Sequence, residues 1–145
     1  MFMCEYSHSL DAKGRLIMPA KFRDVLGDVF VVCKGLDHCL YVYSNEDWEA
    51  FEKQLAGLPL TNKEARQFVR FFLSGASQVE VDKMGRFLLP TSLRTFAGLE
   101  KDVVLAGVGH RIEIWDKDKW ESESLDGDMD EITGMMDSLG ITLTQ

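Results

Sequence analysis

The feature that most constrains how this chain can fold is an internal repeat. Residues 11–23 (DAKGRLIMPAKFR) align without a gap with residues 82–94 (DKMGRFLLPTSLR), and the two segments share an aspartate, a glycine, two arginines and a proline at the same positions. After one inserted residue the correspondence resumes, so that residues 35–43 match residues 107–115. Such self-similarity over more than one segment indicates two copies of one structural unit.

The repeat divides the 145 residues into four parts. Trp48 corresponds to Trp120 and closes each copy, which sets the far boundary of the two modules. We expect module 1 at 5–48, a linker at 49–76, module 2 at 77–120 and a tail at 121–145.

Each module is predicted to be rich in β-structure, with short helices. In module 1 an alternating segment at 6–10 and a strand at 15–18 flank the turn signal Lys13-Gly14, which suggests a hairpin-like bend. Pro19 fits the first turn of a short helix that ends near Gly27, with its apolar face at Phe22, Val25 and Leu26. The remaining strands are predicted at 29–33 and 39–43 in module 1, and at 77–81, 86–89, 102–106 and 111–115 in module 2.

Helices are also expected after each module and in the linker. Ser44 can cap a helix that runs through Trp48, and the equivalent helix of module 2 begins at Asp116. In the linker, residues 61–64 (TNKE) have the pattern of a capping box, and apolar residues then recur at helical spacing: Ala65, Phe68, Val69 and Phe72. We therefore expect a structured linker that packs against the modules rather than a flexible tether.

The net charge of −8 and the isoelectric point of 4.8 are unusual for a nucleic-acid-binding protein. The acidic excess is concentrated in the tail, where residues 121–145 hold seven acids and neither lysine nor arginine. The rest of the chain holds all 16 basic residues against 17 acids and is nearly neutral, so local patches matter more than the total. The tail is too acidic for us to predict a helix there, and we expect a solvated segment.

Composition and motifs argue against several other classes of protein. No stretch approaches the roughly 18 apolar residues of a membrane span, and the first residues lack the pattern of a signal peptide. Cys4, Cys33 and Cys39 are odd in number and lack the spacing of a zinc site, so we expect the last two to be reduced, buried thiols. The chain has no nucleophile elbow, metalloprotease or phosphate-loop motif, so we expect neither an enzyme, nor a cofactor, nor a small-molecule substrate.

Two basic stretches at equivalent positions are the candidate binding residues. Residues 13–23 contain four basic residues and no acid, and residues 83–94 contain three basic residues and no acid. Basic side chains beside a turn can project from a two-stranded ribbon, which fits the major groove of DNA. The basic residues concerned are Lys13, Arg15, Lys21, Arg23, Lys83, Arg86 and Arg94.

A purely structural role explains the same residues. Asp11 could pair with Arg15 across the turn, and Arg23 could cap the short helix that follows. Because a turn that determines the fold would also recur in both copies, the pattern alone leaves both interpretations open.

Residues 1–120 resemble the MraZ family, a tandem form of the SpoVT-AbrB type of DNA-binding domain. The resemblance rests on both D-x-x-x-R segments with the prolines and arginines that follow them, on residues 70–76 (RFFLSGA) and on residues 108–115 (VGHRIEIW). It implies an α+β fold that is mainly β, in which two swapped-hairpin modules intertwine into a pseudo-symmetric β-barrel.

The resemblance also implies a function. Members of this family are cytoplasmic, nucleoid-associated regulators that assemble into rings of many subunits. They bind short tandem repeats in double-stranded DNA upstream of the division and cell-wall gene cluster, which they usually repress. A ring would compensate for the weak DNA binding expected of a nearly neutral protein, because several weak contacts together gain avidity on an operator with matching repeats.

Carried over by position, the resemblance assigns roles to the repeated residues. Arg15 and Arg86 are expected to contact DNA bases, and Lys13 and Lys83 to contact phosphates. Asp11 and Asp82, with the turn residues Gly14 and Gly85, are expected to orient the arginines.

This chain departs from the family pattern at two places. Cys4 stands where a glycine is common, and the acidic tail is an addition that could compete with DNA or tune assembly. A second function remains open, namely a protein-binding or assembly module of AbrB-like fold without a specific DNA target.

Overall fold

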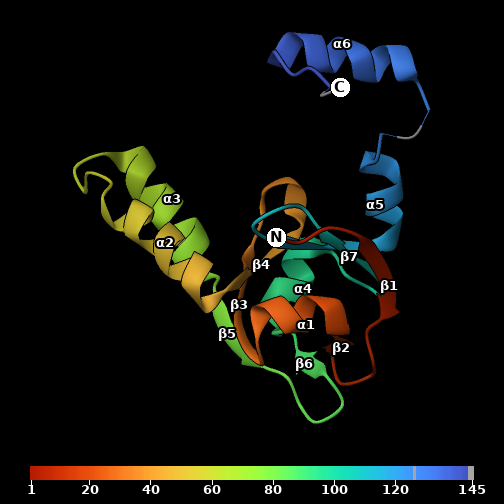
Figure 1. Ribbon diagram of the computed structural model, residues 1–145. Coiled ribbons are helices and arrows are strands. Elements are labelled where there is room, and N and C mark those ends of the chain that lie inside the picture. The colour runs from red at the N-terminus through yellow and green to blue at the C-terminus, as the bar shows by residue number, and fades with distance from the viewer. Residues whose placement is uncertain (126, 144–145) are drawn as a thin grey trace.

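The computed structural model describes residues 1–125 and 127–143, and it is an α+β fold dominated by antiparallel β-structure (Figure 1). Six strands form one sheet in the order β1-β7-β8-β4-β3-β5, and β2 pairs with β6 in a separate two-stranded ribbon. The strands are β1 (Glu5–Ser9), β2 (Arg15–Ile17), β3 (Val29–Lys34), β4 (Leu40–Ser44), β5 (Ser77–Glu80), β6 (Arg86–Leu88), β7 (Asp102–Gly107) and β8 (Ile112–Asp116). The helices are α1 (Ala20–Leu26), α2 (Asn45–Ala56), α3 (Lys63–Ser74), α4 (Thr91–Ala97), α5 (Lys117–Glu123) and α6 (Met129–Leu139), with one short 3₁₀ turn at Leu36–His38.

The two copies of the repeat are intertwined, as the resemblance implied. β1 of the first copy pairs with β7 of the second, β3 pairs with β5, β4 pairs with β8, and β2 pairs with β6. The expected hairpin between the first two strands is therefore wrong: the chain bends at the turn, but each strand pairs with the other copy. The sheet is also not closed into a full barrel, because β1 and β5 are its two edges among the described residues.

One hydrophobic core serves both copies. It contains equivalent residues from each, such as Leu16 and Phe87, which are both 1% exposed. The Phe87 ring packs edge-on against Phe30 of the first copy, with centroids 5.2 Å apart. Since apolar area leaves water only when the two copies come together, this shared core explains why the strands exchange partners.

The two short helices that follow the ribbon strands, α1 and α4, have the predicted limits. Each begins directly after a proline, Pro19 or Pro90, and each is followed by a glycine with positive φ. Phe22 of α1 is buried as predicted, whereas Val25 is 54% exposed, so its assignment to the apolar face is wrong. Phe22 and Leu26, four residues apart, form the buried side of α1, and Val25 lies at the edge of that side, where it meets solvent.

The linker is a helical hairpin, α2 and α3, that projects from the sheet as an arm (Figure 1). The Ser44 hydroxyl accepts a hydrogen bond from the Asp47 amide at 3.1 Å, which confirms the predicted cap. The predicted capping box at Thr61 is wrong, because the cap of α3 is Asn62, whose side chain accepts from the Ala65 amide at 3.1 Å. The predicted packing of the linker is confirmed, since both helices share a second apolar cluster with the sheet: Leu55 of α2 and Phe72 of α3 with Cys33, Cys39, Tyr41 and Trp115.

The thiols of Cys33 and Cys39 are fully buried and free, as expected, whereas Cys4 is exposed. Burial raises the pKa of each buried thiol to about 12 by disfavouring the charged thiolate. Cys4 instead has an unusual backbone, with φ of +79°. That conformation suits glycine, which is the residue common at this position in the family pattern.

The tail contains a helix that the sequence analysis did not predict. The side chain of Asp128 accepts hydrogen bonds from the amides of Asp130 and Glu131 and thereby caps α6. These acids lie in the first turn, where negative charge stabilises a helix rather than opposing it. α6 lies apart from the sheet (Figure 1), and residues 126, 144 and 145 of the predicted tail lie outside the described residues.

Where the structure describes helices, none combines the length and the apolar character that crossing a bilayer requires.

Candidate nucleic-acid interface

The first D-x-x-x-R turn is organised by the carboxylate of Asp11. Its Oδ1 accepts hydrogen bonds from the backbone amides of Lys13 and Arg15, at 3.0 and 2.8 Å. Its Oδ2 accepts from the Arg15 Nε at 2.7 Å. One side chain therefore fixes both the path of the turn and the direction of the arginine.

The second turn repeats this geometry almost atom for atom. Asp82 accepts from the amides of Met84 and Arg86 and from the Arg86 Nε, each at 2.9 Å. The match shows that Lys13 corresponds to Met84, whereas Lys83 lies one residue nearer its aspartate. The two expected phosphate contacts therefore occupy different places in their turns.

Both aspartates are held in the ionised form. The pKa of Asp11 lies below its ordinary value, mainly because the backbone N–H of Arg15 donates to the carboxylate. The pKa of Asp82 is lowered for the same reason by the backbone N–H of Arg86. Fixed N–H groups thus stabilise the ionised carboxylates, and the charge of each is balanced by the arginine with which it is paired.

The β2–β6 ribbon brings the equivalent arginines of the two copies onto one surface. Leu16 and Phe87 face each other across the ribbon and point into the core. Because side chains alternate along a strand, Arg15 and Arg86 point to the opposite, outward side. Each turn lies at the start of a ribbon strand and adds an exposed lysine, Lys13 or Lys83.

The arginines keep part of their hydrogen-bonding capacity. Within the described residues, Arg15 and Arg86 are each bonded to their aspartate through Nε alone. Their side chains are 29% and 28% exposed, and no described residue accepts a hydrogen bond from their terminal guanidinium nitrogens. Such a pair of positioned guanidinium groups can bind phosphate or the acceptor edge of guanine.

Two further predicted contacts, Arg23 and Arg94, lie behind the turns of the opposite copy. The Arg94 guanidinium lies against Gly14, and a Cβ at that glycine would be only 2.7 Å from Cζ. Arg23 lies against Gly85 in the same way, at 3.1 Å. Both glycines suit the positive φ of their turns, +80° at Gly14 and +78° at Gly85, and Gly14 also leaves the space that the Arg94 guanidinium fills.

The two supporting arginines differ in how firmly they are held. Arg94 donates from Nε to the Leu89 carbonyl at 3.0 Å and from Nη2 to the Thr91 hydroxyl at 2.9 Å. The Arg23 Nε is buried without a hydrogen-bond partner among the described residues. Lys21, the remaining predicted contact, is exposed on α1.

Two residues of the outward surface were not singled out from the sequence. Ile17 and Leu88 are 42% and 56% exposed and share the outward side of the ribbon with the arginines. The signal was present, since each lies two residues after an arginine and therefore on the same side of its strand.

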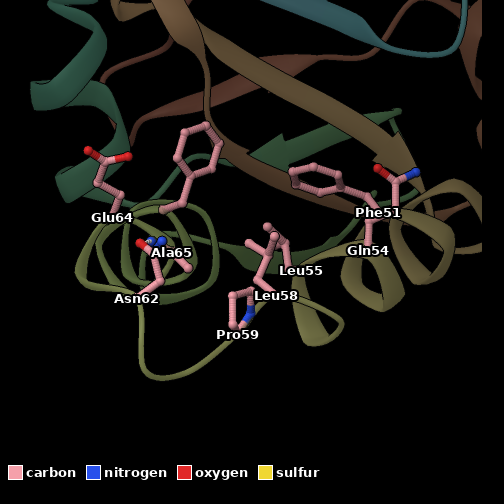
Figure 2. A pocket seen from close by; sticks show the side chains of 9 residues that line it. Phe51, Gln54, Leu55, Leu58, Pro59, Asn62, Glu64 and Ala65 are labelled. Carbon is pink, nitrogen blue, oxygen red and sulfur yellow. Dashed lines mark hydrogen bonds between the residues drawn. The ribbon is translucent and has the colours of Figure 1, made fainter.

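The described residues also form an apolar hollow, which lies in the helical arm away from the ribbon. It has a volume of about 410 Å³ and is lined by α2 and α3, with Phe51, Leu55 and Phe68 on its walls (Figure 2). Glu64 is the one titratable residue in its lining. This chemistry suits packing of apolar groups and provides no acid–base pair.

Comparison with known proteins places the whole chain in one family. The family model described as "MraZ protein, putative antitoxin-like" matches twice, at residues 1–71 and 72–126. A protein of Acetivibrio thermocellus named transcriptional regulator MraZ is 56% identical over 97% of this chain and 100% of its own length. Proteins of the same name from Lachnoclostridium phytofermentans and Clostridium beijerinckii are 57% and 55% identical, over 98% and 97% of this chain and 99% and 100% of theirs. With two matches of the family model and relatives of this similarity over nearly the full length, the chain belongs to the MraZ family.

Proposed function

We propose that this protein is a sequence-specific DNA-binding transcriptional regulator. The observation that carries the proposal is the outward side of the β2–β6 ribbon, where two positioned arginines from different copies lie on one surface. A two-stranded ribbon fits the major groove, and an arginine there can bind guanine through two hydrogen bonds. The relatives are named transcriptional regulators, which supports the same conclusion.

Each residue of the surface then has a role in the proposal. Arg15 and Arg86 bind base edges, while Lys13, Lys83 and Lys21 bind phosphates. The carboxylates of the two turns orient the arginines without touching the anionic DNA. Arg23 and Arg94 pack against the turns and hold them in position for DNA binding. This role is in addition to any contact that the two arginines make with DNA themselves.

The finer parts of the proposal come from the family resemblance. We propose that the protein represses the division and cell-wall gene cluster, including its own promoter, in the cytoplasm at the nucleoid. It acts as a homo-oligomeric ring on tandem short repeats, so that several ribbons engage several half-sites. Avidity of this kind lets a protein with a net charge of −8 bind DNA through a few local basic groups.

The test is Arg15→Ala, measured by fluorescence anisotropy with labelled DNA from upstream of the protein's own gene. Loss of one bidentate base contact weakens binding by about 5- to 150-fold per engaged subunit. The matched control is Lys53→Ala, which also removes one positive charge but lies on the exposed side of α2. Wild-type affinity should fall steeply with salt, as expected when basic groups displace counterions.

Native mass spectrometry completes the test, because the variant must keep the wild-type subunit number. Wild-type binding that Arg15→Ala leaves unchanged would refute the role of the ribbon. If the intact wild-type assembly shifts no promoter DNA at low salt, the second candidate is favoured, a protein-binding module. The apolar hollow of the helical arm is the observation that favours that alternative.

A further inference from the structure

Two of the four strand residues on the outward side of the ribbon are aliphatic, and DNA binding by the two arginines does not explain why. Ile17 and Leu88 end the two strands with 42% and 56% of their surface exposed. An antiparallel pair with one buried side normally carries polar residues on the other. Here both copies of the repeat place an aliphatic residue at the same exposed position.

The pairing register sets these side chains among the arginines. Ile17 is directly opposite Arg86, and Leu88 is directly opposite Arg15. Side chains directly opposite on an antiparallel pair have Cβ atoms about 4.5–5.5 Å apart. The four residues therefore form one compact patch, in which each aliphatic residue lies directly beside the arginine of the other copy.

We propose that Ile17 and Leu88 contact thymine methyl groups in the major groove, which makes them determinants of sequence specificity. This inference rests on the proposed DNA binding and deepens it. The C5-methyl group of thymine is the one apolar feature that base pairs display in the major groove, and aliphatic side chains recognise it by contact. The flanking arginines and lysines attract the anionic backbone, so DNA is the occupant that matches both the charge and the apolar centre of the surface.

The geometry also predicts the kind of site that is read. An aliphatic group opposite an arginine lies within the span of neighbouring base pairs, since one base-pair step along DNA is about 3.4 Å. The preferred sites thus have thymines directly beside the guanines that the arginines bind. Replacing such a thymine with uracil removes the methyl contact without removing any hydrogen bond.

The experiment uses promoter DNA in which uracil replaces thymine, because uracil lacks only the methyl group. The promoter fragment is amplified with dUTP or dTTP, and the affinity of the assembled protein is measured for both forms. Burial of one methyl group changes affinity about fourfold, so two contacts per ribbon predict a preference of roughly 15-fold for thymine DNA. The double variant Ile17→Ser/Leu88→Ser should bind both forms with nearly equal affinity.

Two controls make the outcome specific. Leu60→Ser removes an exposed leucine from the loop between α2 and α3, which lies on another side of the molecule from the ribbon, and it should keep the wild-type preference (Figure 1). Any effect of uracil on DNA shape acts equally on all variants and cancels when their preferences are compared.

An equal thymine preference in the wild type and the double variant would overturn the proposal. A changed subunit number in the double variant, measured by native mass spectrometry, would also overturn it, because the two residues would then be subunit contacts. Both results leave the proposed function intact as long as Arg15→Ala still weakens DNA binding while Lys53→Ala does not, so the two failures are distinguishable.

Discussion

Replacing Gly14 with alanine should destabilise the protein more than the same change at Gly85, although the two backbones are nearly identical. Their φ values are +80° and +78°, so both variants place an alanine in the left-handed region. That strain costs about 1–2 kcal/mol, and the reduced entropy of the unfolded chain offsets about 0.4–1 kcal/mol of it. The shared part of the effect is therefore a net loss of about 1 kcal/mol.

The difference comes from the arginine behind each turn. At Gly14 the new Cβ would be 2.7 Å from the Arg94 Cζ, and two hydrogen bonds hold that guanidinium in place. Displacing it sacrifices a hydrogen bond of a charged group, which is worth about 1.5 kcal/mol. At Gly85 the nearest Arg23 atoms are 3.1 Å away, and the Nε of Arg23 has no partner to lose among the described residues. We expect a total loss of about 2.5 kcal/mol for Gly14→Ala and about 1 kcal/mol for Gly85→Ala.

Urea unfolding followed by tryptophan fluorescence measures both values. All variants are compared at one protein concentration, because assembly contributes to apparent stability. A double-mutant cycle isolates the contact: Gly14→Ala combined with Arg94→Ala should cost about 1–1.5 kcal/mol less than the sum of the single changes. The control combines Gly85→Ala with Arg94→Ala and should be additive within about 0.5 kcal/mol, since the atoms nearest to a Gly85 Cβ belong to Arg23.

Equal losses at the two glycines would refute this reasoning, as would additivity of Gly14→Ala and Arg94→Ala. Either result would mean that the guanidinium moves aside freely, and Arg94 would then not support the turn of the other copy.

Two further predictions concern the backbone at Cys4 and the charged turns. Cys4→Gly should raise the unfolding free energy by about 0.5–1 kcal/mol, because glycine relieves the strain of a φ of +79° at a smaller entropic cost; a lower urea midpoint would contradict this. In the folded protein the pKa values of Asp11 and Asp82 lie below the ordinary value of 3.8. Their ionised carboxylates therefore stabilise the folded state fully above pH 3.8. This stabilisation is lost as the pH falls through the lower, folded-state pKa. Titration of these carboxylates should therefore not change DNA affinity between pH 8 and 5. Below about pH 4, the unfolding free energy of the Asp11→Asn variant should fall less steeply with pH than that of the wild type. An equal pH dependence in the two proteins would show that ionised Asp11 does not contribute to stability.

Much of the local structure could be predicted from the sequence because its signals are local. Pro19 could be recognised as the start of a helix, since the fixed φ of proline suits the first turn and its missing N–H is not needed there. Ser44 caps α2 through a hydrogen bond to a residue three positions away. The repeat itself predicted that both turns would have the same geometry, and the hydrogen bonds of Asp11 and Asp82 match in every partner.

Predictions that depended on distant partners were less successful. Val25 and Phe68 have the spacing of buried residues, yet they are 54% and 53% exposed, because burial depends on whether another element covers that position. The helix α6 was missed because its acids were counted as a total, whereas their placement in the first turn is what favours the helix.

The sequence by itself determined that the molecule has two copies of one unit, where each copy turns, and which basic residues accompany the turns. These properties follow from residue types at short spacing, which act through local sterics and hydrogen bonds. Only the tertiary structure decided that β2 pairs with β6, and hence that Arg15 and Arg86 share one surface with Ile17 and Leu88. Strand pairing is set by the burial of Leu16 and Phe87 in a core that neither copy completes alone, and no local pattern encodes that choice.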